Sequence, residues 1–371
     1  MKISGFRISF AFTLSFVFSL FFSRLALAFP EYVRHHYFSC TACHVSPSGG
    51  GVLNGYGRTI STELLSTWGS QEEVGFLQGL VPVGEEDKLF FGGNLRSLQV
   101  HVENSQFKRG FPVRMQAGLE MGYRSDSIAT AIFVGKLSPD GNIWTPYSPR
   151  YWVSGQLTET TSLRAGRYLP NFGLNIPQHR AVTREGLGFD QGTERDTVEV
   201  QRTTETLETV LGYSQSVETD DSVDPEKALH FQINAFLAEQ HRVGVSLWMG
   251  DRGPMKIRKI SLHGVLGYSE HFYQLAEMAQ LSEANSNEIK GKYAYTKLGY
   301  EVHKGIHLLL DLQYKKSNDE DVRTEAQQKG VGFAFYPRPH FELEGLFAKR
   351  RDVSDAFRDY DYGYLQMHYY F

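Results

Sequence analysis

The sequence predicts an all-β protein, a transmembrane antiparallel β-barrel of about 16 strands preceded by a small N-terminal segment. Three observations support this fold class. Apolar and polar residues alternate with a period of two almost without pause from residue 88 to residue 371. Tight connections alternate with longer polar ones, and the final alternating stretch ends in an aromatic residue, Phe371.

Residues 1–28 read as an export signal. Lys2 and Arg7 precede an apolar run, and the small-residue stretch at 26–28 matches a cleavage site. The alternative, a retained membrane helix, is disfavoured because Arg24 ends the apolar run before the roughly 20 residues that a span needs. We therefore expect the mature chain to begin at Phe29, in the envelope of a Gram-negative cell.

The barrel is expected over residues 88–371. In the stretch 113–124, for example, Val113, Leu119 and Tyr123 fall on one face, while Arg114, Gln116, Glu120 and Arg124 fall on the other. The same alternation gives sixteen candidate strands, near 88–104, 110–124, 126–137, 148–159, 161–170, 196–203, 206–217, 227–238, 240–251, 255–268, 270–282, 291–302, 305–317, 327–337, 339–351 and 359–371.

Alternation alone also fits a sandwich, so the connections decide between the two folds. Tight turns at 125–126, 160–161, 204–205, 303–304 and 338–339 are separated by longer polar loops. Outer-membrane barrels have this rhythm, with short periplasmic turns, long extracellular loops and an even number of strands. A closed sheet also leaves no unpaired backbone in lipid.

A barrel of this size encloses a lumen wide enough for water or a plug. The predicted inward-facing residues are charged, which suits such a wall and is unfavourable against lipid. They are Arg114, Glu120, Arg124, Arg164, Asp311, Glu342 and Glu344.

The chemistry-bearing motif lies in residues 29–87. Cys40, Cys43 and His44 form C-x-x-C-H and include the only two cysteines of the chain. This spacing is the attachment pattern of c-type haem, with the thiols bonded to the porphyrin and the histidine as proximal iron ligand. Two alternatives are a zinc site completed by His35 or His36, and a redox dithiol, although no thioredoxin-like pattern surrounds the motif.

The distal iron ligand is less constrained. His35 and His36 precede the motif closely, and no methionine lies between residues 29 and 114. His36 or His35 is thus the candidate distal ligand, with a barrel residue or an open site as alternatives. The segment 29–87 is too short to build a strong core alone, so we expect it to lean on the barrel from the periplasmic side. The two placements open to it are the periplasm and the barrel lumen, where it would act as a plug.

One connection, residues 171–195, far exceeds a hairpin loop. We expect it either to fold inward, where its arginines could contact haem propionates, or to lie on the surface. Its charged and imidazole residues are His179, Arg180, Arg184, Asp190, Glu194 and Arg195. A formal net charge of −4 provides no basic footprint for nucleic acid.

The order of signal, single C-x-x-C-H and porin-sized barrel resembles the fused monohaem cytochrome-porins of the outer membrane. The matching residues are Cys40, Cys43, His44 and Pro47, with Tyr56, Gly57 and Arg58 shortly after. The glycine-rich stretch before Leu53 departs from the pattern of the iron oxidisers. The resemblance implies one covalent haem c and electron transfer between an extracellular donor or acceptor and a periplasmic carrier, such as a cytochrome or a copper protein.

Two functions follow as hypotheses. The first is an outer-membrane electron relay, with extracellular ferrous iron as one candidate donor; the sequence does not decide whether it is an enzyme. The second is an outer-membrane solute channel whose haem segment is a structural plug or a redox gate. A purely periplasmic haem protein is disfavoured by the loop rhythm.

Overall fold

The structure is a computed structural model that describes residues 27–28, 33–34, 42–46, 51–75, 88–136, 147–176, 178, 181–218, 223–238, 240–353 and 358–371. Most of the expected signal, and His35, His36, Cys40 and Pro47, lie outside these residues. In the loop expected at 171–195, His179 and Arg180 also lie outside them.

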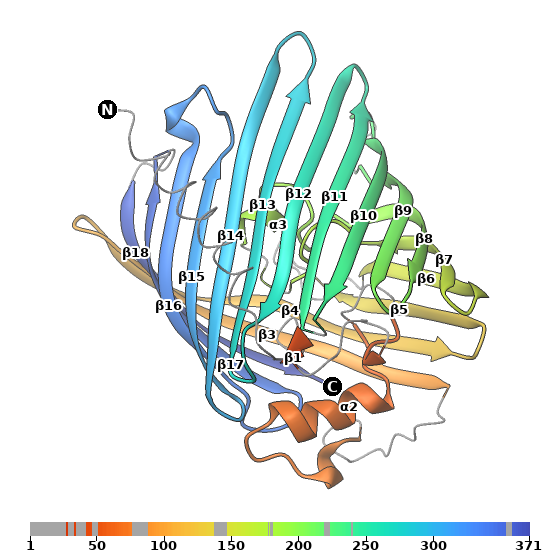
Figure 1. The fold of residues 1–371 in the computed structure, drawn as a ribbon. Coiled ribbons are helices and arrows are strands. Elements are labelled where there is room, and N and C mark those ends of the chain that lie inside the picture. Colours follow the sequence, from red (N-terminus) through yellow and green to blue (C-terminus); the bar gives the residue numbers. More distant parts are fainter. Residues whose placement is uncertain are drawn as a thin grey trace.

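Sixteen antiparallel strands form a closed barrel, in which each strand pairs with its neighbours in the sequence and β18 pairs with β3 (Figure 1). The strands are β3 (Leu89–Glu103), β4 (Lys108–Arg124), β5 (Ile128–Lys136), β6 (Tyr147–Thr158), β7 (Thr161–Tyr168), β8 (Arg195–Thr203), β9 (Leu207–Ser216), β10 (Lys227–Leu237), β11 (His241–Arg252), β12 (Met255–Gly267), β13 (Phe272–Ala284), β14 (Glu288–His303), β15 (Ile306–Lys316), β16 (Glu325–Phe335), β17 (Phe341–Asp352) and β18 (Asp359–Tyr370).

The prediction of the fold class is confirmed, and the sixteen candidate strands agree with the observed ones apart from shifts of a few residues at their ends. The turns at 125–127, 159–160, 204–206 and 304–305 lie at one end of the barrel, which we call the short-turn end. The connections 253–254 and 285–287 are the exceptions, since they are short at the opposite end.

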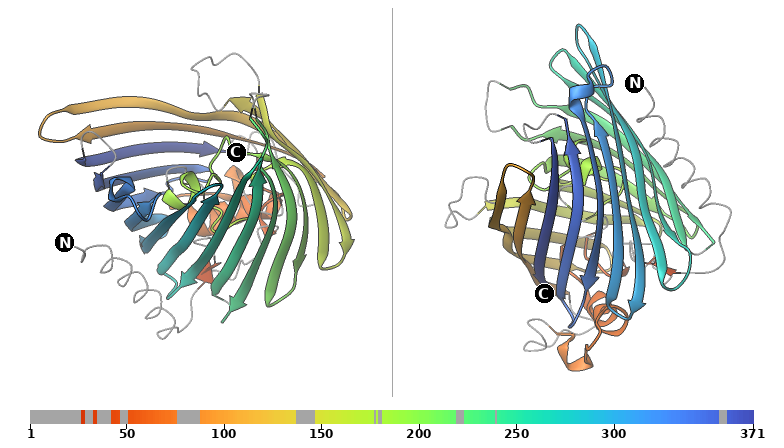
Figure 2. Two further views of the ribbon diagram at one scale, coloured as in Figure 1. Left: turned by 90° about the horizontal axis from the view of Figure 1, so that it is seen from above. Right: turned by 90° about the vertical axis from the view of Figure 1, so that its left-hand side faces the viewer.

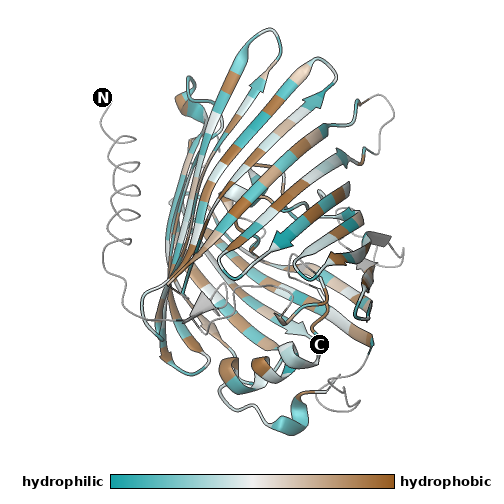
Figure 3. Ribbon diagram, turned by 45° about the vertical axis from the view of Figure 1, so that its right-hand side comes forward, coloured by the Kyte–Doolittle hydropathy of each residue, from teal (hydrophilic) through white to brown (hydrophobic). Residues whose placement is uncertain are grey.

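The two faces of the wall differ in composition, and Figure 3 shows the resulting alternation along the strands. In β15, Leu308 and Leu310 are exposed on the outer face, whereas His307, Leu309 and Asp311 are buried on the inner face. The inward placement of Glu120, Arg164, Asp311 and Glu344 is thereby confirmed, since all four are buried.

Two further residues predicted to face inward, Arg114 and Arg124, lie on β4. Arg124 was expected to face inward and falls on the same side of the strand as the buried Glu120 and Gly122, but it is exposed because it is the last residue of the strand, beside the turn. The β3–β4 pairing contains an irregularity between Arg96 and Ser97, so the alternation shifts there. The side chain of Arg114 lies outside those that the structure describes.

The described part of the chain also contains short helical elements that do not belong to the barrel wall. α2 (Gly55–Ile60) continues directly into a π-helical turn (Ser61–Leu65). Short 3-10 turns follow at Gln71–Glu73 and Val322–Thr324, and α3 (Val182–Glu185) lies in the long connection. Two-residue strands β1 (Leu27–Ala28) and β2 (Val33–Arg34) pair with each other. None of the described helices has the length and apolar composition of a membrane span.

Candidate functional site in the barrel lumen

Two segments occupy the inside of the barrel. We call residues 42–46 and 51–75 the plug segment, and the connection between β7 and β8, residues 169–194, the lumen loop. In Figure 1, α2 lies at the same end of the barrel as the C-terminus, and in Figure 2 the strands surround α3 of the lumen loop. The plug segment therefore lies at the short-turn end. The lumen loop folds into the barrel, which is the first of the two positions predicted for it.

The described part of the C-x-x-C-H motif is held by backbone hydrogen bonds. His44 forms a β-bridge with Leu53, and the Asn54 amide donates to the Cys43 carbonyl at 2.9 Å. The Asn54 side chain connects the motif to α2, because its Nδ2 donates to the Ala42 carbonyl and its Oδ1 accepts from the amide of Gly57. Asn54 is thus the N-cap of α2, a role for which asparagine is well suited.

Gly57 explains why α2 can lie so close to the motif. A Cβ at this position would be 2.3 Å from the Cys43 carbonyl oxygen, closer than any side chain can approach. The glycine therefore permits direct backbone packing between the motif and the helix. The side chains of Cys43 and His44 remain half-buried, so both are reachable from outside the segment.

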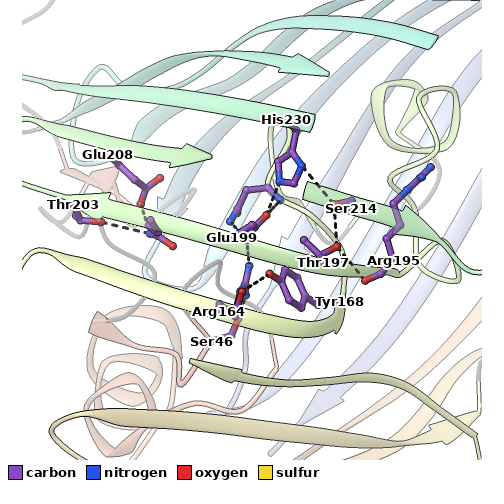
Figure 4. Close-up of polar contacts among 12 residues, drawn as sticks. Ser46, Arg164, Tyr168, Arg195, Thr197, Glu199, Thr203, Glu208, Ser214 and His230 are labelled. Carbon is purple, nitrogen blue, oxygen red and sulfur yellow. Dashed lines mark hydrogen bonds and ion pairs between the residues drawn. The ribbon is translucent and has the colours of Figure 1, made fainter. Parts of the chain in front are cut away.

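Beyond His44 the plug segment enters the lumen. Val45 and Val52 are buried and pack with four wall residues, Phe90, Ala131, Trp152 and Tyr168. Next to Val45, the hydroxyl of Ser46 lies 3.3 Å from Nη1 of Arg164 on β7 (Figure 4). The motif is therefore fixed to the inner face of the wall by an apolar contact and by a polar one.

Arg164 on β7 contacts both Ser46 of the plug segment and Glu199 on β8 (Figure 4). Glu199 is in turn bonded to the lumen loop, so that the plug segment, the wall and the loop are connected. The Glu199 carboxylate accepts hydrogen bonds from Arg164 Nη2 at 2.6 Å and from His230 Nε2 at 3.0 Å. It also accepts two bonds from Asn171 of the lumen loop, from the amide at 2.8 Å and from Nδ2 at 3.0 Å. Because Arg164 and Glu199 are both almost fully buried, each charge depends on the other.

The lumen loop is packed against the wall by apolar side chains. Phe172 and Phe189 stack with ring centroids 4.5 Å apart, and both rings meet Trp248 on β11 edge to face. Inside the loop, Nη1 of the buried Arg184 donates to the carbonyls of Phe172 and Leu174. These contacts fix the loop in one conformation.

The plug segment, the lumen loop and the wall share one apolar core. Its members are Ile60 and Leu65 from the plug segment, Leu174, Ile176 and Ala181 from the loop, and Val265, Leu275, Tyr295, Leu309, Ala334 and Tyr336 from the wall and its turn. Inward polar residues of the wall, such as Ser214, Asn234 and Ser246, are fully shielded from solvent. The described residues thus fill much of the lumen.

Hydrogen bonds also fasten the plug segment to the rim of the short-turn end. The amides of Thr67 and Trp68 donate to the carbonyls of Tyr336 and Pro337. In return, Nη1 of Arg338 donates to the Trp68 carbonyl at 2.8 Å. The rim and the plug segment are therefore joined in both directions.

Arg58 of α2 and His340 of the turn between β16 and β17 are both buried. Arg58 is 1% exposed, and its Nη2 donates to the Phe91 carbonyl at 2.6 Å. Burial lowers the pKa of Arg58 to about 10, so the guanidinium stays charged at neutral pH. Burial, and secondly the positive charge of Arg58, lower the pKa of His340 to about 3, so this imidazole is neutral.

The described residues of the motif are compatible with haem attachment. The Cys43 thiol and the His44 imidazole are half-buried on a rigid turn, which suits covalent attachment and ligation. Cys40, His35 and His36 lie outside the described residues, so the second thiol and the distal ligand are not tested. Within the described ranges, no group of three or more histidine, cysteine or acidic residues forms a metal site, and the zinc alternative depends on the same three residues.

The sequence did not reveal the residues that seat the motif. Asn54 had a local signal, since asparagine before a helix start predicts an N-cap. Arg164 was predicted to face inward, but its partner Ser46 was not, because the two residues lie 118 positions apart in the chain. Glu199 had no signal of its own.

Comparisons with known proteins add to this picture. No family model and no curated protein matches the sequence. Solved structures do match, over nearly their full length. The outer-membrane protein OmpT of Vibrio cholerae has a TM-score of 0.59 at 11% identity, over 78% of this chain and 100% of that one. The channel DcaP of Acinetobacter baumannii has a TM-score of 0.59 at 12% identity, over 83% of this chain and 100% of that one.

An anion-selective porin from Comamonas acidovorans also has a TM-score of 0.59, at 12% identity, over 76% of this chain and 99% of that chain. At such identities the similarity establishes the fold, which is the 16-stranded barrel of the outer-membrane porins. The barrel half of the resemblance to cytochrome-porins is confirmed. The cytochrome half stays a prediction.

Proposed function

We propose that the protein is an outer-membrane channel of porin architecture whose lumen is closed by the plug segment and the lumen loop. The observation that carries this proposal is the shared core of plug segment, loop and wall, which places ordered chain where an open porin has water. Both chain ends are expected at the short-turn end, which in an outer membrane faces the periplasm.

The plug segment is also the predicted site of a haem c. Cys40 and Cys43 would hold it covalently, and His44 would ligate its iron. When bound, such a group supplies one-electron chemistry. The chain's own contribution is positioning: Asn54 and Gly57 fix the motif against α2, and Ser46 ties it to Arg164. A haem on this segment would let redox state influence the closure.

A second function, the electron relay, is favoured by the position of the motif inside the mouth of the barrel, with Val45 buried against the wall. A hydrocarbon core of roughly 30 Å separates the periplasm from external donors. Insertion of the motif into the lumen shortens the distance that electrons must cross to an extracellular partner. A periplasmic cytochrome or copper protein would exchange electrons at the short-turn end.

One preparation tests both functions. The full chain, produced with a c-type maturation system, is expected to keep its haem stain after denaturation, and a Cys40→Ala/Cys43→Ala variant is expected to lose it. Absence of stain and of a Soret band in protein extracted from outer membranes would refute haem attachment.

Reconstituted liposomes then separate channel from relay. A closed channel predicts low solute flux that rises when the plug segment is loosened. A relay predicts that an impermeant external reductant reduces the haem, seen as a shift of its Soret band, and that an acceptor trapped inside the liposomes is reduced as well. Solute flux should stay unchanged. High flux through the unmodified protein would contradict closure.

A further inference from the structure

The closure at the short-turn end contains a histidine in an unusual setting. His340, in the turn between β16 and β17, is 1% exposed, and neither ring nitrogen has a hydrogen-bond partner among the described residues. Its backbone has a φ of 66°, a value that is uncommon for residues with a side chain, although histidine adopts it more often than most. A buried polar group without a partner is costly and calls for an explanation.

The groups that face His340 come from three elements. Arg58 of α2 supplies the positive charge that acts on it. From β18, the Tyr370 ring meets the imidazole edge to face at 5.6 Å, and the Tyr370 amide donates to the His340 carbonyl. The nearby carboxylate of Glu342 on β17 is engaged by His368, whose Nδ1 lies 2.9 Å from Glu342 Oε2. The acidic group in this neighbourhood thus already has a basic partner.

Tyr370 also contacts the plug segment, since its hydroxyl lies 3.4 Å from the Ser61 hydroxyl. Tyr370 therefore contacts both His340 and the π-helical turn that continues α2, the helix that carries Arg58. A proton on the imidazole would place two positive charges together in a buried interface, where like charges repel strongly and solvent cannot screen them.

We propose that His340 is a proton-operated latch: protonation beside Arg58 drives the plug segment from the wall and opens the lumen at acidic pH. This inference rests on the proposed closure of the channel. The proposal explains why the His340 imidazole is buried without a hydrogen-bond partner among the described residues. An exposed or hydrogen-bonded histidine would take up a proton without separating α2 from the wall.

The direction of the effect follows from proton linkage. The closed state holds His340 with a pKa of about 3, whereas a released His340 has the ordinary value of 6.5. Closure is therefore fully favoured above about pH 6.5 and is lost progressively as the pH falls toward 3. The ratio of released to seated plug segment should rise about tenfold for each pH unit below 6.5, or about 30-fold at pH 5.

The test is conductance of the full-length protein in planar bilayers at pH 8, 6.5 and 5 and constant salt. We expect conductance to rise on acidification in the unmodified protein but not in His340→Asn, because asparagine tolerates a positive φ and does not titrate. His271→Asn removes an exposed histidine from a turn at the same end and should leave the response intact. Heat-modifiable migration of each variant on gels confirms that its barrel is folded.

His340→Arg provides the converse, since a permanent charge should open the channel at pH 8. The latch is overturned if His340→Asn responds to acid like the unmodified protein, or if acid opens neither. A Gly51→Ala variant, which loosens the plug segment independently of His340, separates the two proposals. If Gly51→Ala conducts at every pH while the unmodified protein does not respond to acid, only the latch is refuted. If Gly51→Ala also stays closed at every pH, the proposed plugged channel is refuted.

Discussion

Gly51 is a position where an added methyl group has two separate costs. Its φ is +67°, which side chains rarely adopt, and a Cβ there would lie 2.6 Å from both carboxylate oxygens of Glu120 on β4. The backbone conformation alone costs alanine about 1 kcal/mol. The contact adds to this cost, because the carboxylate of the buried Glu120 has to shift to admit the methyl group.

We therefore predict that Gly51→Ala loosens the plug segment and raises channel conductance, measured in planar bilayers at neutral pH. Gly192→Ala is the matched control, since Gly192 has a φ of +95° but nothing within 4 Å of the position that an added methyl group would take. If conductance rises as much in Gly192→Ala as in Gly51→Ala, backbone strain anywhere in the lumen is sufficient to open the channel, and the contact with Glu120 is not the cause.

Glu199 and Asp196 offer a matched pair of carboxylates on one strand. Both bond to an arginine, Glu199 to Arg164 on the buried inner face and Asp196 to Arg167 on the exposed outer face. Removing one partner of a buried pair costs about 3–5 kcal/mol, whereas an exposed pair contributes about 0–1 kcal/mol. The same chemical change should therefore have very different effects at the two positions.

We predict that Glu199→Gln lowers the free energy of unfolding by several kcal/mol and that Asp196→Asn changes it by less than about 1 kcal/mol. Denaturant titrations followed by tryptophan fluorescence measure both. Equal effects would mean that Glu199 does not connect the lumen as the contacts indicate.

At this scale, the sequence allowed prediction of residues whose role is local. Cys43 and His44 belong to a motif that is defined by spacing along the chain, and their role in holding haem stays a prediction. His340 was not recognisable, because its role depends on Arg58, which lies far away in the sequence and adjacent only in the fold. A contact of this kind leaves no periodicity to detect.

Among the elements, β18 closes the ring and bears the chain terminus. Phe371 extends it by two backbone bonds: its amide donates to the Gly93 carbonyl at 3.1 Å, and its carbonyl accepts from the Gly93 amide at 2.8 Å. The Phe371 ring lies where a Cβ on Gly93 would stand, 2.5 Å from that position. Gly93 thus makes room for the last residue of the chain.

We predict that Phe371→Ser reduces the amount of folded barrel recovered from outer membranes several-fold, because the seam between β3 and β18 loses its terminal aromatic contact. Gel migration of unheated samples measures the folded fraction. Val331→Ser, a change of an exposed apolar residue away from the seam, is the control. Equal losses in both variants would assign the effect to reduced lipid contact.

The strands were the most predictable elements, because each one alternates between lipid and lumen over its own length. The lumen loop was predictable as an irregular element and ambiguous in position, since its inward course depends on the fit of Phe172 and Phe189 around Trp248. Arg124 shows the limit of periodicity, because a strand end can carry a charge on either face.

For the whole molecule, the distribution of buried charge distinguishes this barrel from an empty cylinder. Arg164, Glu199 and Lys259 are buried on its inner face, and each is bonded to another charged group or to the lumen loop. The sequence predicted a charged interior but could not predict whether water or protein would fill it. That outcome depends on how two segments pack together, which no single stretch encodes.

At the scale of the molecule we predict that haem attachment and barrel folding are separable. The Cys40→Ala/Cys43→Ala variant should lose haem and retain a heat-modifiable barrel, because the described contacts of the plug segment are made mainly by Val45, Ser46 and α2. Parallel measurement of the Soret band and of gel migration tests this. An unfolded double variant would mean that the haem is part of the core.

The pairing of β3 with β18 has a consequence for biogenesis. The two strands come from opposite ends of the barrel sequence, so the cylinder stays open along one side until the C-terminal residues have been delivered. The plug segment precedes every strand of the barrel in the sequence. The plug segment can therefore pack against the inner face of the wall through the open side of the barrel, and pairing of β18 with β3 then encloses it.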